Sequence, residues 1–465
     1  MRGARVLRAL SSCSLCALFV TFAVAAPSCK RASSSGDAAT EASALSDADV
    51  DAAPTLLPAR CKPTEEGATL AEGADLADLE IGEAAPSRDG FAIGVVRKKE
   101  GQLVGSVAMA SRDAAAVSFV DLGAPYADAP PPRPITQGET TYAFFYSRGE
   151  TPKPAPLAKG ATRAAAVETR ELSLYRVAAG KAQLAATLAQ QKDESLAFDA
   201  ALASGDKGML VAWDEDSIGL LRGEIKVQAL GADAKPLGPA RAASPSTSDA
   251  ELPRLARRRG GYWLVWVARR LESPDAAPDP GHEVETPGEK RAFRWLELVL
   301  LDERGAVVGA VKRLTSATGH VSIFDLAARD GGGGRDGVEV LDIIARDDEQ
   351  TVDGSGGRVV RITVNGDAAD PPIAIVADAV GRGVPDLLAG MPAGDGASAP
   401  AWLVYADTTD HVRLLPLDAT RSPLAAPSAE DALDKSRPLL ASPSGLLVAV
   451  PAEPKRQLKL VPCAR

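Results

Sequence analysis

The chain has 465 residues, of which 45% are hydrophobic and 25% are charged, a globular composition that excludes wholesale disorder. It carries 52 Lys and Arg residues against 62 Asp and Glu residues, and this net charge of −10 argues against a nucleic-acid-binding protein. With only three histidines and five cysteines the chain offers little material for a metal site, so we expect no metal and no cofactor.

The first 28 residues have the pattern of a secretory signal peptide. Residues 1–8 are basic, and residues 9–26 are uncharged and mostly apolar, which is typical of an exported protein. An uncleaved membrane anchor is the alternative, because an apolar stretch of about 18 residues is just long enough to span a bilayer.

A cysteine and a polar segment follow the signal peptide. Residues 26–29, APSC, are a degenerate form of the motif that precedes a lipid-modified cysteine, and residues 30–54 have too few large apolar side chains to fold. This order of signal, cysteine, tether and domain resembles that of bacterial lipoproteins. The resemblance implies that Cys29 carries lipid and anchors the domain 55–465 to a membrane of the cell envelope, with the outer membrane favoured. Cleavage after Ala25 is the alternative and would give a soluble periplasmic or secreted protein.

Short apolar runs recur along the folded region. Each is too short for a helix and rich in Val, Leu, Trp and Tyr, so each predicts a buried strand. The runs are GFAIGV (90–95), TYAFFY (141–146), GMLVAW (208–213), GYWLVW (261–266), VEVLDI (338–343), PAWLVY (400–405) and GLLVAV (445–450). A Pro-x-Leu type of segment, such as PRLA (253–256), precedes most runs, and an alternating strand, such as EIKVQAL (224–230), follows them.

Four antiparallel strands per unit, repeated about seven times, are the pattern of a β-propeller. Residues 55–465 resemble propeller domains generally, without the signature of a specific family. We therefore predict an all-β fold with seven four-stranded blades; six or eight blades, or a pair of β-sandwiches, are the alternatives. Trp213 and Trp266 end two of the buried runs, and we predict that both pack between blades.

The last repeat lacks a fourth strand at the C-terminus. We predict that residues 55–61 supply this strand, so that the two ends of the chain share one blade and no free edge remains. Cys61 and Cys463 would then lie on adjacent strands and form a disulfide, as expected in an oxidising compartment. Two separate buried thiols are the alternative.

Charged residues follow the buried run of most repeats. If that run is the second strand of each blade, these charges lie in second-to-third-strand turns on one face of the propeller, where loops often carry binding. The predicted binding face contains Asp214, Glu215, Asp216, Arg269, Arg270, Asp347, Asp348, Glu349, Asp407 and Asp410. The alternative is that these turns are charged only because they are solvated.

No metalloprotease or nucleophile-elbow motif occurs in the chain, and Cys13 and Cys16, which have thiol-redox spacing, would leave with the signal peptide. The main expectation is therefore a non-enzymatic binding or scaffolding lipoprotein of the bacterial envelope, whose charged face binds a protein or a polysaccharide. The alternative is a propeller glycan hydrolase or lyase, with acid/base carboxylates such as Asp214 and Asp347 converging over a cleft. A purely structural array is a third reading.

Overall fold

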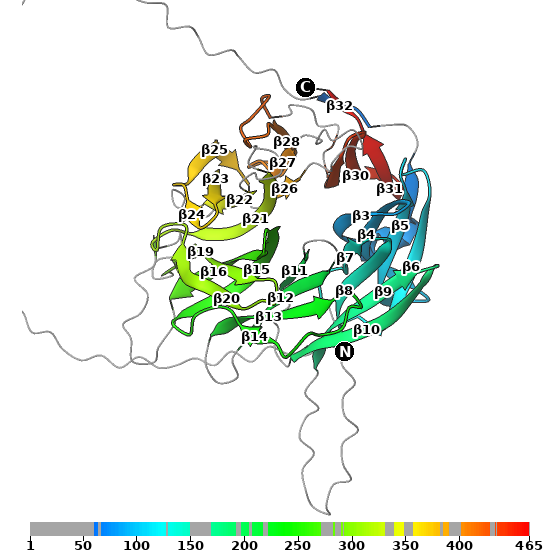
Figure 1. Cartoon of the computed structure of the whole chain (residues 1–465). Helices are drawn as coiled ribbons and strands as arrows, with labels where there is room; N and C mark the ends of the chain where they lie inside the picture. Colours follow the sequence, from blue (N-terminus) through cyan, green and yellow to red (C-terminus); the bar gives the residue numbers. More distant parts are fainter. Residues whose placement is uncertain are drawn as a thin grey trace, which may run out of the picture. The chain divides into compact units, whose positions relative to one another are not determined.

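Seven antiparallel β-sheets are arranged as blades around a central axis in the computed structural model of the protein (Figure 1). The blades belong to one unit, Leu56–Arg465. The residues that the structure describes are 60–63, 67–126, 129–148, 169–191, 197–203, 207–216, 222–270, 282–283, 290–291, 293–330, 339–347, 357–381, 385–389, 401–427, 433 and 435–464. The prediction of an all-β, seven-bladed propeller is confirmed.

The strands of a blade follow one another outwards from the axis (Figure 1). Blade one contains β3 (Glu80–Ser87), β4 (Gly90–Lys99), β5 (Gln102–Ser111) and β6 (Val117–Pro125), and blade two contains β7 (Arg133–Gln137), β8 (Thr140–Arg148), β9 (Arg170–Ala178) and β10 (Lys181–Gln191). Blade three contains β11 (Phe198–Leu202), β12 (Gly208–Asp216), β13 (Gly223–Gly231) and β14 (Arg241–Ala242). Blade four contains β15 (Ser248–Arg258), β16 (Gly261–Arg270), β19 (Arg294–Asp302) and β20 (Val307–Arg313). A separate two-stranded sheet, β17 (His282–Glu283) with β18 (Lys290–Arg291), lies in the sequence between β16 and β19.

The last three blades depart slightly from the four-stranded pattern. Blade five contains β21 (Val321–Asp330), β22 (Glu339–Asp347) and β23 (Gly357–Asn365), and both β24 (Ala368–Ala369) and β25 (Ile373–Val380) pair with β23. Blade six contains β26 (Asp386–Leu388), β27 (Ala401–Ala406) and β28 (Val412–Leu417). Blade seven contains β29 (Arg437–Ser442), β30 (Gly445–Ala452), β31 (Lys455–Val461) and β2 (Ala68–Glu72). Blade six thus has three strands within the described part of the chain. The helix described there is a short 3₁₀ turn, Gly73–Asp78, and no described helix is long and apolar enough to cross a bilayer.

The buried runs predicted from the sequence form the second strand of each blade. They are apolar on both faces because each blade is covered by a neighbour on either side. Trp213 lies in a buried cluster with Tyr146 of the preceding blade, and Trp266 lies in one with Leu210 of the preceding blade. The prediction that both tryptophans pack between blades is therefore confirmed.

The two ends of the described chain are joined at blade seven. β1 (Arg60–Cys61) pairs with β32 (Cys463–Ala464), and Cys61 and Cys463 form a disulfide with Cα atoms 4.1 Å apart. The predicted disulfide is confirmed.

The strand that completes blade seven differs from the predicted one. β2 (Ala68–Glu72) pairs with β31 as the outer strand, whereas Cys61 belongs to the separate two-stranded sheet. Pro63 has no N–H group and follows that short sheet closely, so a longer ladder is disfavoured there. The segment of β2 contains no proline and alternates between buried and partly exposed residues.

The propeller has one face that carries both the beginnings of the innermost strands and the turns between second and third strands. These features coincide because the second strand of each blade runs antiparallel to the first. We call it the entry face.

Candidate active site

The innermost strand of every blade contributes one charged residue at the same position of the repeat. A proline or an apolar residue precedes it in most blades, and apolar residues follow, as in FDAA (198–201), PRLA (253–256) and FDLA (324–327). In blade order the seven residues are Glu83, Arg133, Asp199, Arg254, Asp325, Asp386 and Arg437. We call this set the axial ring.

Glu83 is the centre of the ion pairs in the axial ring. Its Oε1 lies 2.5 Å from Nη1 of Arg133 and 3.0 Å from Nη1 of Arg254. Because blades one and four are not neighbours, the second pair crosses the axis. Although Glu83 lies deep in the protein, its side chain is 44% exposed, since it faces a cavity. Burial alone would raise the pKa of Glu83, but the positive charges of Arg133 and Arg254 outweigh burial and lower that pKa.

A cavity of about 380 Å³ lies on the entry face at the axial ring. The charged side chains on its wall are Glu83, Arg133, Arg254 and Arg437, and Phe198 and Phe324 are among its apolar residues. Three guanidinium groups and one carboxylate lie on the wall itself, and the carboxylate of Asp199 pairs with Arg133 outside the wall. Such a wall, apolar with a few convergent polar groups, suits a small anionic ligand or one unit of an anionic polymer.

Two carboxylates of the ring hold the backbone of the following blade. Oδ2 of Asp199 accepts a hydrogen bond from the N–H of Leu255 at 2.7 Å, and Oδ2 of Asp325 accepts one from the N–H of Leu387 at 2.8 Å. Asp199 also lies 2.7 Å from Nη2 of Arg133. These contacts tie blade three to blade four and blade five to blade six, so both residues position the ring.

Burial raises the pKa values of three acids of the ring, Asp199, Asp325 and Asp386, and Asp386 differs from the other two in its partners. In the described part of the chain, no residue is seen to donate a hydrogen bond to its carboxyl group or to form an ion pair with it. Burial, reinforced by the negative charge of Asp325, raises the pKa of Asp386 to about 7, from an ordinary value of 3.8. A carboxyl group with this pKa can take up or release a proton near neutral pH, as a general acid or base must.

Two residues of the predicted binding face, Asp214 and Arg269, have partners within the scaffold, and those of Asp214 line the axial cavity. Asp214 is buried, and its carboxylate accepts hydrogen bonds from the N–H groups of Ala197 at 3.2 Å and Leu252 at 3.1 Å, both of which line the cavity. Arg269 donates to the buried carboxylate of Asp249 in the same blade. Asp214 therefore braces the wall of the cavity, and Arg269 acts within the scaffold of blade four.

Two other acids of the predicted face form pairs inside their own blades. In blade five Asp347 accepts hydrogen bonds from Nε and Nη2 of Arg358 at 2.9 and 2.7 Å, and in blade six Asp407 accepts one from Nε of Arg413 at 2.8 Å. Burial opposes ionisation of Asp407, but bonds from its turn and from Arg413 lower its pKa. The acids Asp214, Asp347 and Asp407 thus lie in three different blades, and none is on the wall of the axial cavity.

The remaining predicted site residues are dispersed or undescribed. Arg270 and Asp410 are exposed, Glu215 is half-buried, and Asp216 ends β12. Asp348, Glu349 and Cys29 lie outside the described residues. In the part of the chain that the structure describes, no group of three or more His, Cys, Asp or Glu side chains could hold a metal ion.

None of the seven ring residues was among the predicted site residues. Their signal was nevertheless present in the sequence, because the middle position of the Pro-x-Leu segments is Arg or Asp in most repeats. A charge recurring at one position of otherwise apolar inner strands indicates an axial ring, since equivalent positions of a propeller meet at its axis.

No protein-family model and no curated protein sequence matches the chain. Among solved structures, the chain is similar to an ulvan lyase of polysaccharide lyase family PL25, with a TM-score of 0.50, 9% identity, and coverage of 84% of this chain and 96% of that one. It is also similar to the polysaccharide lyase Uly1, with a TM-score of 0.47, 9% identity, and coverage of 90% and 93%. An endo-arabinase from Bacteroides thetaiotaomicron has a TM-score of 0.37, 12% identity, and coverage of 63% and 95%. At such low sequence identity, these structural similarities show the propeller fold alone.

These findings correct the main functional expectation of a non-enzymatic binding or scaffolding protein. The solved propellers to which the chain is similar include polysaccharide lyases and glycosidases, and at 9–12% identity this likeness shows a shared fold. The expectation was wrong because it relied on the absence of short catalytic motifs. The ionisable groups here come from separate blades, and no short motif can contain them.

Proposed function

We propose that the axial cavity is the active site of an enzyme that cleaves an anionic polysaccharide by acid/base chemistry. The observation that carries the proposal is a charged ring in which Glu83, on the cavity wall, has a lowered pKa, while the three other acids, Asp199, Asp325 and Asp386, lie in the ring but outside that wall and have raised pKa values. The pKa of Glu83 is lowered, mainly because Arg133 and Arg254 outweigh its burial, and that of Asp386 is raised to about 7. Opposed shifts of this kind assign different roles to two carboxyl groups.

The arginines of the wall supply binding and charge stabilisation. Arg133 and Arg254 are already oriented by Glu83, and Arg437 donates to the backbone carbonyl of Ile81. Guanidinium groups held in this way can accept the carboxylate or sulfate of an acidic sugar without reorganising. The arginines of the wall therefore select an anionic glycan over a neutral one.

Asp386 is the proposed proton donor or acceptor of the reaction. In a hydrolase it would protonate the leaving oxygen, and Glu83 would be the second, ionised carboxylate. In a lyase the ionised form of Asp386 would remove the proton from the carbon next to the sugar carboxylate, the C–O bond to the leaving sugar would break as a C=C bond forms, and the leaving oxygen would take a proton from water. The arginines would neutralise the carboxylate of the sugar. Both reactions use the same wall, and their products distinguish them: elimination leaves an unsaturated sugar end that absorbs ultraviolet light, and hydrolysis does not.

The test is an assay of the purified protein on alginate, polygalacturonate, ulvan and chondroitin sulfate. We expect new reducing ends from at least one of these polymers, and an activity about 10²–10⁴-fold lower for Asp386→Asn. Asp410→Asn is the matched control, since Asp410 is an exposed acid in a second-to-third-strand turn on the entry face, and it should keep full activity. Equal activity of Asp386→Asn and the original protein would overturn the role of Asp386, and cleavage of no polymer would overturn the proposed function.

We also propose that the enzyme is a lipoprotein of the bacterial envelope, with Cys29 as the lipidated residue. The support is the order of signal, cysteine and tether in residues 1–54. Changing Cys29→Ala should move the protein from the membrane fraction to the soluble fraction. A mature N-terminus at Ala26, found by mass spectrometry, would contradict lipidation.

A further inference from the structure

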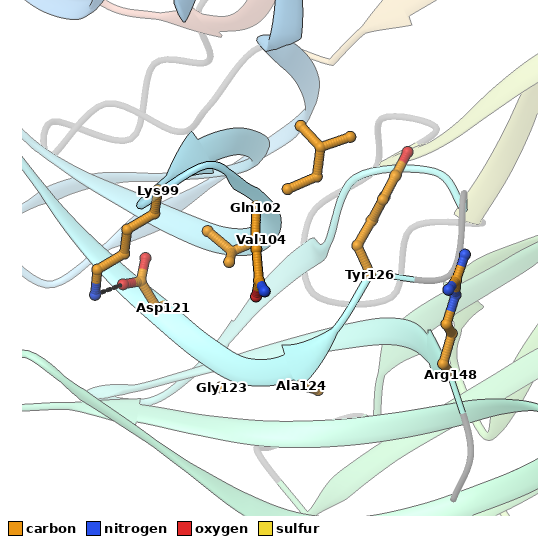
Figure 2. Close-up of a pocket in the computed structure, with 9 residues that line it drawn as sticks. Lys99, Gln102, Val104, Asp121, Gly123, Ala124, Tyr126 and Arg148 are labelled. Atoms are coloured by element: carbon orange, nitrogen blue, oxygen red, sulfur yellow. Dashed lines mark hydrogen bonds and ion pairs between the residues drawn. The ribbon is translucent and has the colours of Figure 1, made fainter. Parts of the chain in front are cut away.

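A second cavity of about 660 Å³ lies on the entry face, away from the axis, where blades one and two meet. Lys99 ends β4, Gln102 and Val104 lie at the start of β5, Asp121 belongs to β6, and Arg148 ends β8. Figure 2 shows Lys99 with Asp121 at one end of this cavity and Tyr126 with Arg148 at the other. We call it the rim cavity.

The rim cavity exists because β6 departs from a regular ladder. Val104 pairs with Pro125 and Ser106 pairs with Asp121. A step of two residues along β5 thus corresponds to a step of four residues along β6, which is a bulge in β6. Gly123 lies within this bulge at a φ of 74°, a conformation that glycine adopts without strain. The bulge bends the strand and places the residues after it at the border of blade two.

One end of the rim cavity has a fixed excess of positive charge. Oδ2 of Asp121 lies 2.8 Å from Nζ of Lys99, while Oδ1 lies 2.6 Å from Nη2 of Arg97 and accepts a hydrogen bond from Ser106 at 2.7 Å. Two cations share one carboxylate, so Lys99 keeps bonding capacity for an anion. At the opposite end lies the guanidinium group of Arg148, near Tyr126, whose hydroxyl contacts the carboxylate of Glu80 (Figure 2).

The middle of the rim cavity suits the body of a sugar. Gln102 lies there with donor and acceptor atoms for hydroxyl groups, beside Val104 (Figure 2). The hydroxyl of Tyr126 lies 3.4 Å from Oε1 of Glu80, which holds the ring at the end of the cavity. An amide, an apolar floor and an aromatic ring, with Lys99 at one end and Arg148 at the other, suit an acidic saccharide.

The two cavities are close neighbours along β3. Glu80 contacts Tyr126 of the rim cavity, and Glu83, on the wall of the axial cavity, follows three residues later within the irregular part of β3. At most about 10 Å of strand therefore separates them. A polymer that crosses the entry face can therefore occupy both cavities at once.

We propose that the rim cavity is a distal subsite for the same anionic glycan and that it favours long chains over short ones. This inference rests on the proposed function, because it assigns the substrate of the axial cavity to a second site. A ligand that fills both sites gains affinity through the higher effective concentration of its second unit. Short oligosaccharides fill the axial cavity alone and gain nothing from the rim.

The experiment measures binding in the Asp386→Asn protein. The polymer bound most tightly in affinity electrophoresis, among alginate, polygalacturonate, ulvan and chondroitin sulfate, is cut to a dimer and an octamer for calorimetry. Arg148→Ala should weaken binding of the octamer about tenfold, as expected for the loss of one charge-assisted contact, and leave the dimer unchanged. Arg270→Ala is the matched control, because Arg270 also ends the second strand of a blade but lies outside the rim cavity.

The outcomes separate the subsite from the catalytic proposal. An unchanged octamer affinity in both Arg148→Ala and Tyr126→Ala, or the absence of binding to any of the four polymers, overturns the subsite. A selective loss of octamer binding in a protein that cleaves none of the polymers supports the subsite and removes the proposed function. Equal losses for dimer and octamer also overturn the subsite, since they would mean that Arg148 acts through the axial cavity or the fold.

Discussion

The two sides of the axial ring differ in how their charges are neutralised. In blades one to four, Glu83, Arg133, Asp199 and Arg254 form a continuous set of ion pairs. On the side of blades five and six, Asp325 is held by backbone N–H groups, and no described residue is seen to pair with Asp386. The same repeat position thus gives a preorganised binding wall on one side and a titratable carboxyl group on the other. The partners supplied by neighbouring blades determine which role a charged residue takes.

The paired side depends on the packing between blades three and four, and we expect Trp266→Ala to have the largest effect on stability. Trp266 is fully buried among side chains of both blades, so its truncation should cost about 3–5 kcal/mol. Trp295 is the control, because it is only partly buried in the same cluster and its indole also donates to Glu297. Urea unfolding should show a clearly smaller loss for Trp295→Ala. Equal losses of stability in the two variants would mean that the buried position of Trp266 between blades three and four contributes no more than the partly buried position of Trp295.

Glu83→Gln breaks the ion pairs of the paired side directly. It leaves Arg133 and Arg254 without their shared carboxylate, and we expect a loss of about 1–2 kcal/mol, below that of a fully buried pair because Glu83 faces the cavity. Glu139→Gln is the control, since its pair with Arg88 also joins blades one and two but is exposed to solvent. Denaturant midpoints that fall equally in the two variants would contradict a special role for Glu83.

Asp386→Asn tests the unpaired side through the pH dependence of stability. The folded protein keeps the proton of Asp386 up to about pH 7, whereas the ordinary pKa is 3.8, so the folded state binds more protons between these values. Excess proton binding by the folded state makes stability fall as the pH rises through this window. The asparagine variant should lack this contribution and unfold at a higher temperature than the original protein at pH 8, with little difference at pH 4. A lower melting temperature at pH 8 would be inconsistent with a raised pKa.

Asp325→Asn should produce the smallest change, a shift in the pH profile of kcat/KM. The substitution removes a negative charge that raises the pKa of Asp386 and keeps an oxygen that can accept from Leu387. The limb of the profile near pH 7 should move towards lower pH by roughly one unit or less. Asp410→Asn should leave the limb in place, and an unmoved limb in Asp325→Asn would show that the two acids are not coupled.

Much of the fold could be predicted from the sequence because the second strands have apolar side chains on both faces. The runs GMLVAW and GYWLVW can be recognised as buried strands from their own residues, without knowledge of their neighbours in space. Their two tryptophans, Trp213 and Trp266, pack between blades as predicted. The last blade was harder, since several short segments could pair with β31, and the proline after Lys62 decided against the segment ending at Cys61.

The site could not be predicted to the same depth. Its residues are on average about 60 positions apart, and only closure of the ring brings them together. The binding site was predicted in the turns between second and third strands because many charged residues occur there. Asp214, Asp347 and Asp407, however, bond to other residues of the scaffold. A single charge inside an apolar inner strand is a weak signal in one repeat and becomes informative when it recurs in seven.

The titration of Asp386 tests most directly whether the axial ring is a catalytic site. Carboxyl carbons of aspartate can be followed by NMR across pH in the purified protein, and Asp386→Asn assigns the signal. We predict a pKa near 7 in the free protein, and a shift of the signal when an acidic oligosaccharide fills the cavity. An ordinary pKa of about 4, unchanged by the oligosaccharide, would contradict the assignment of Asp386 as the proton-exchanging group.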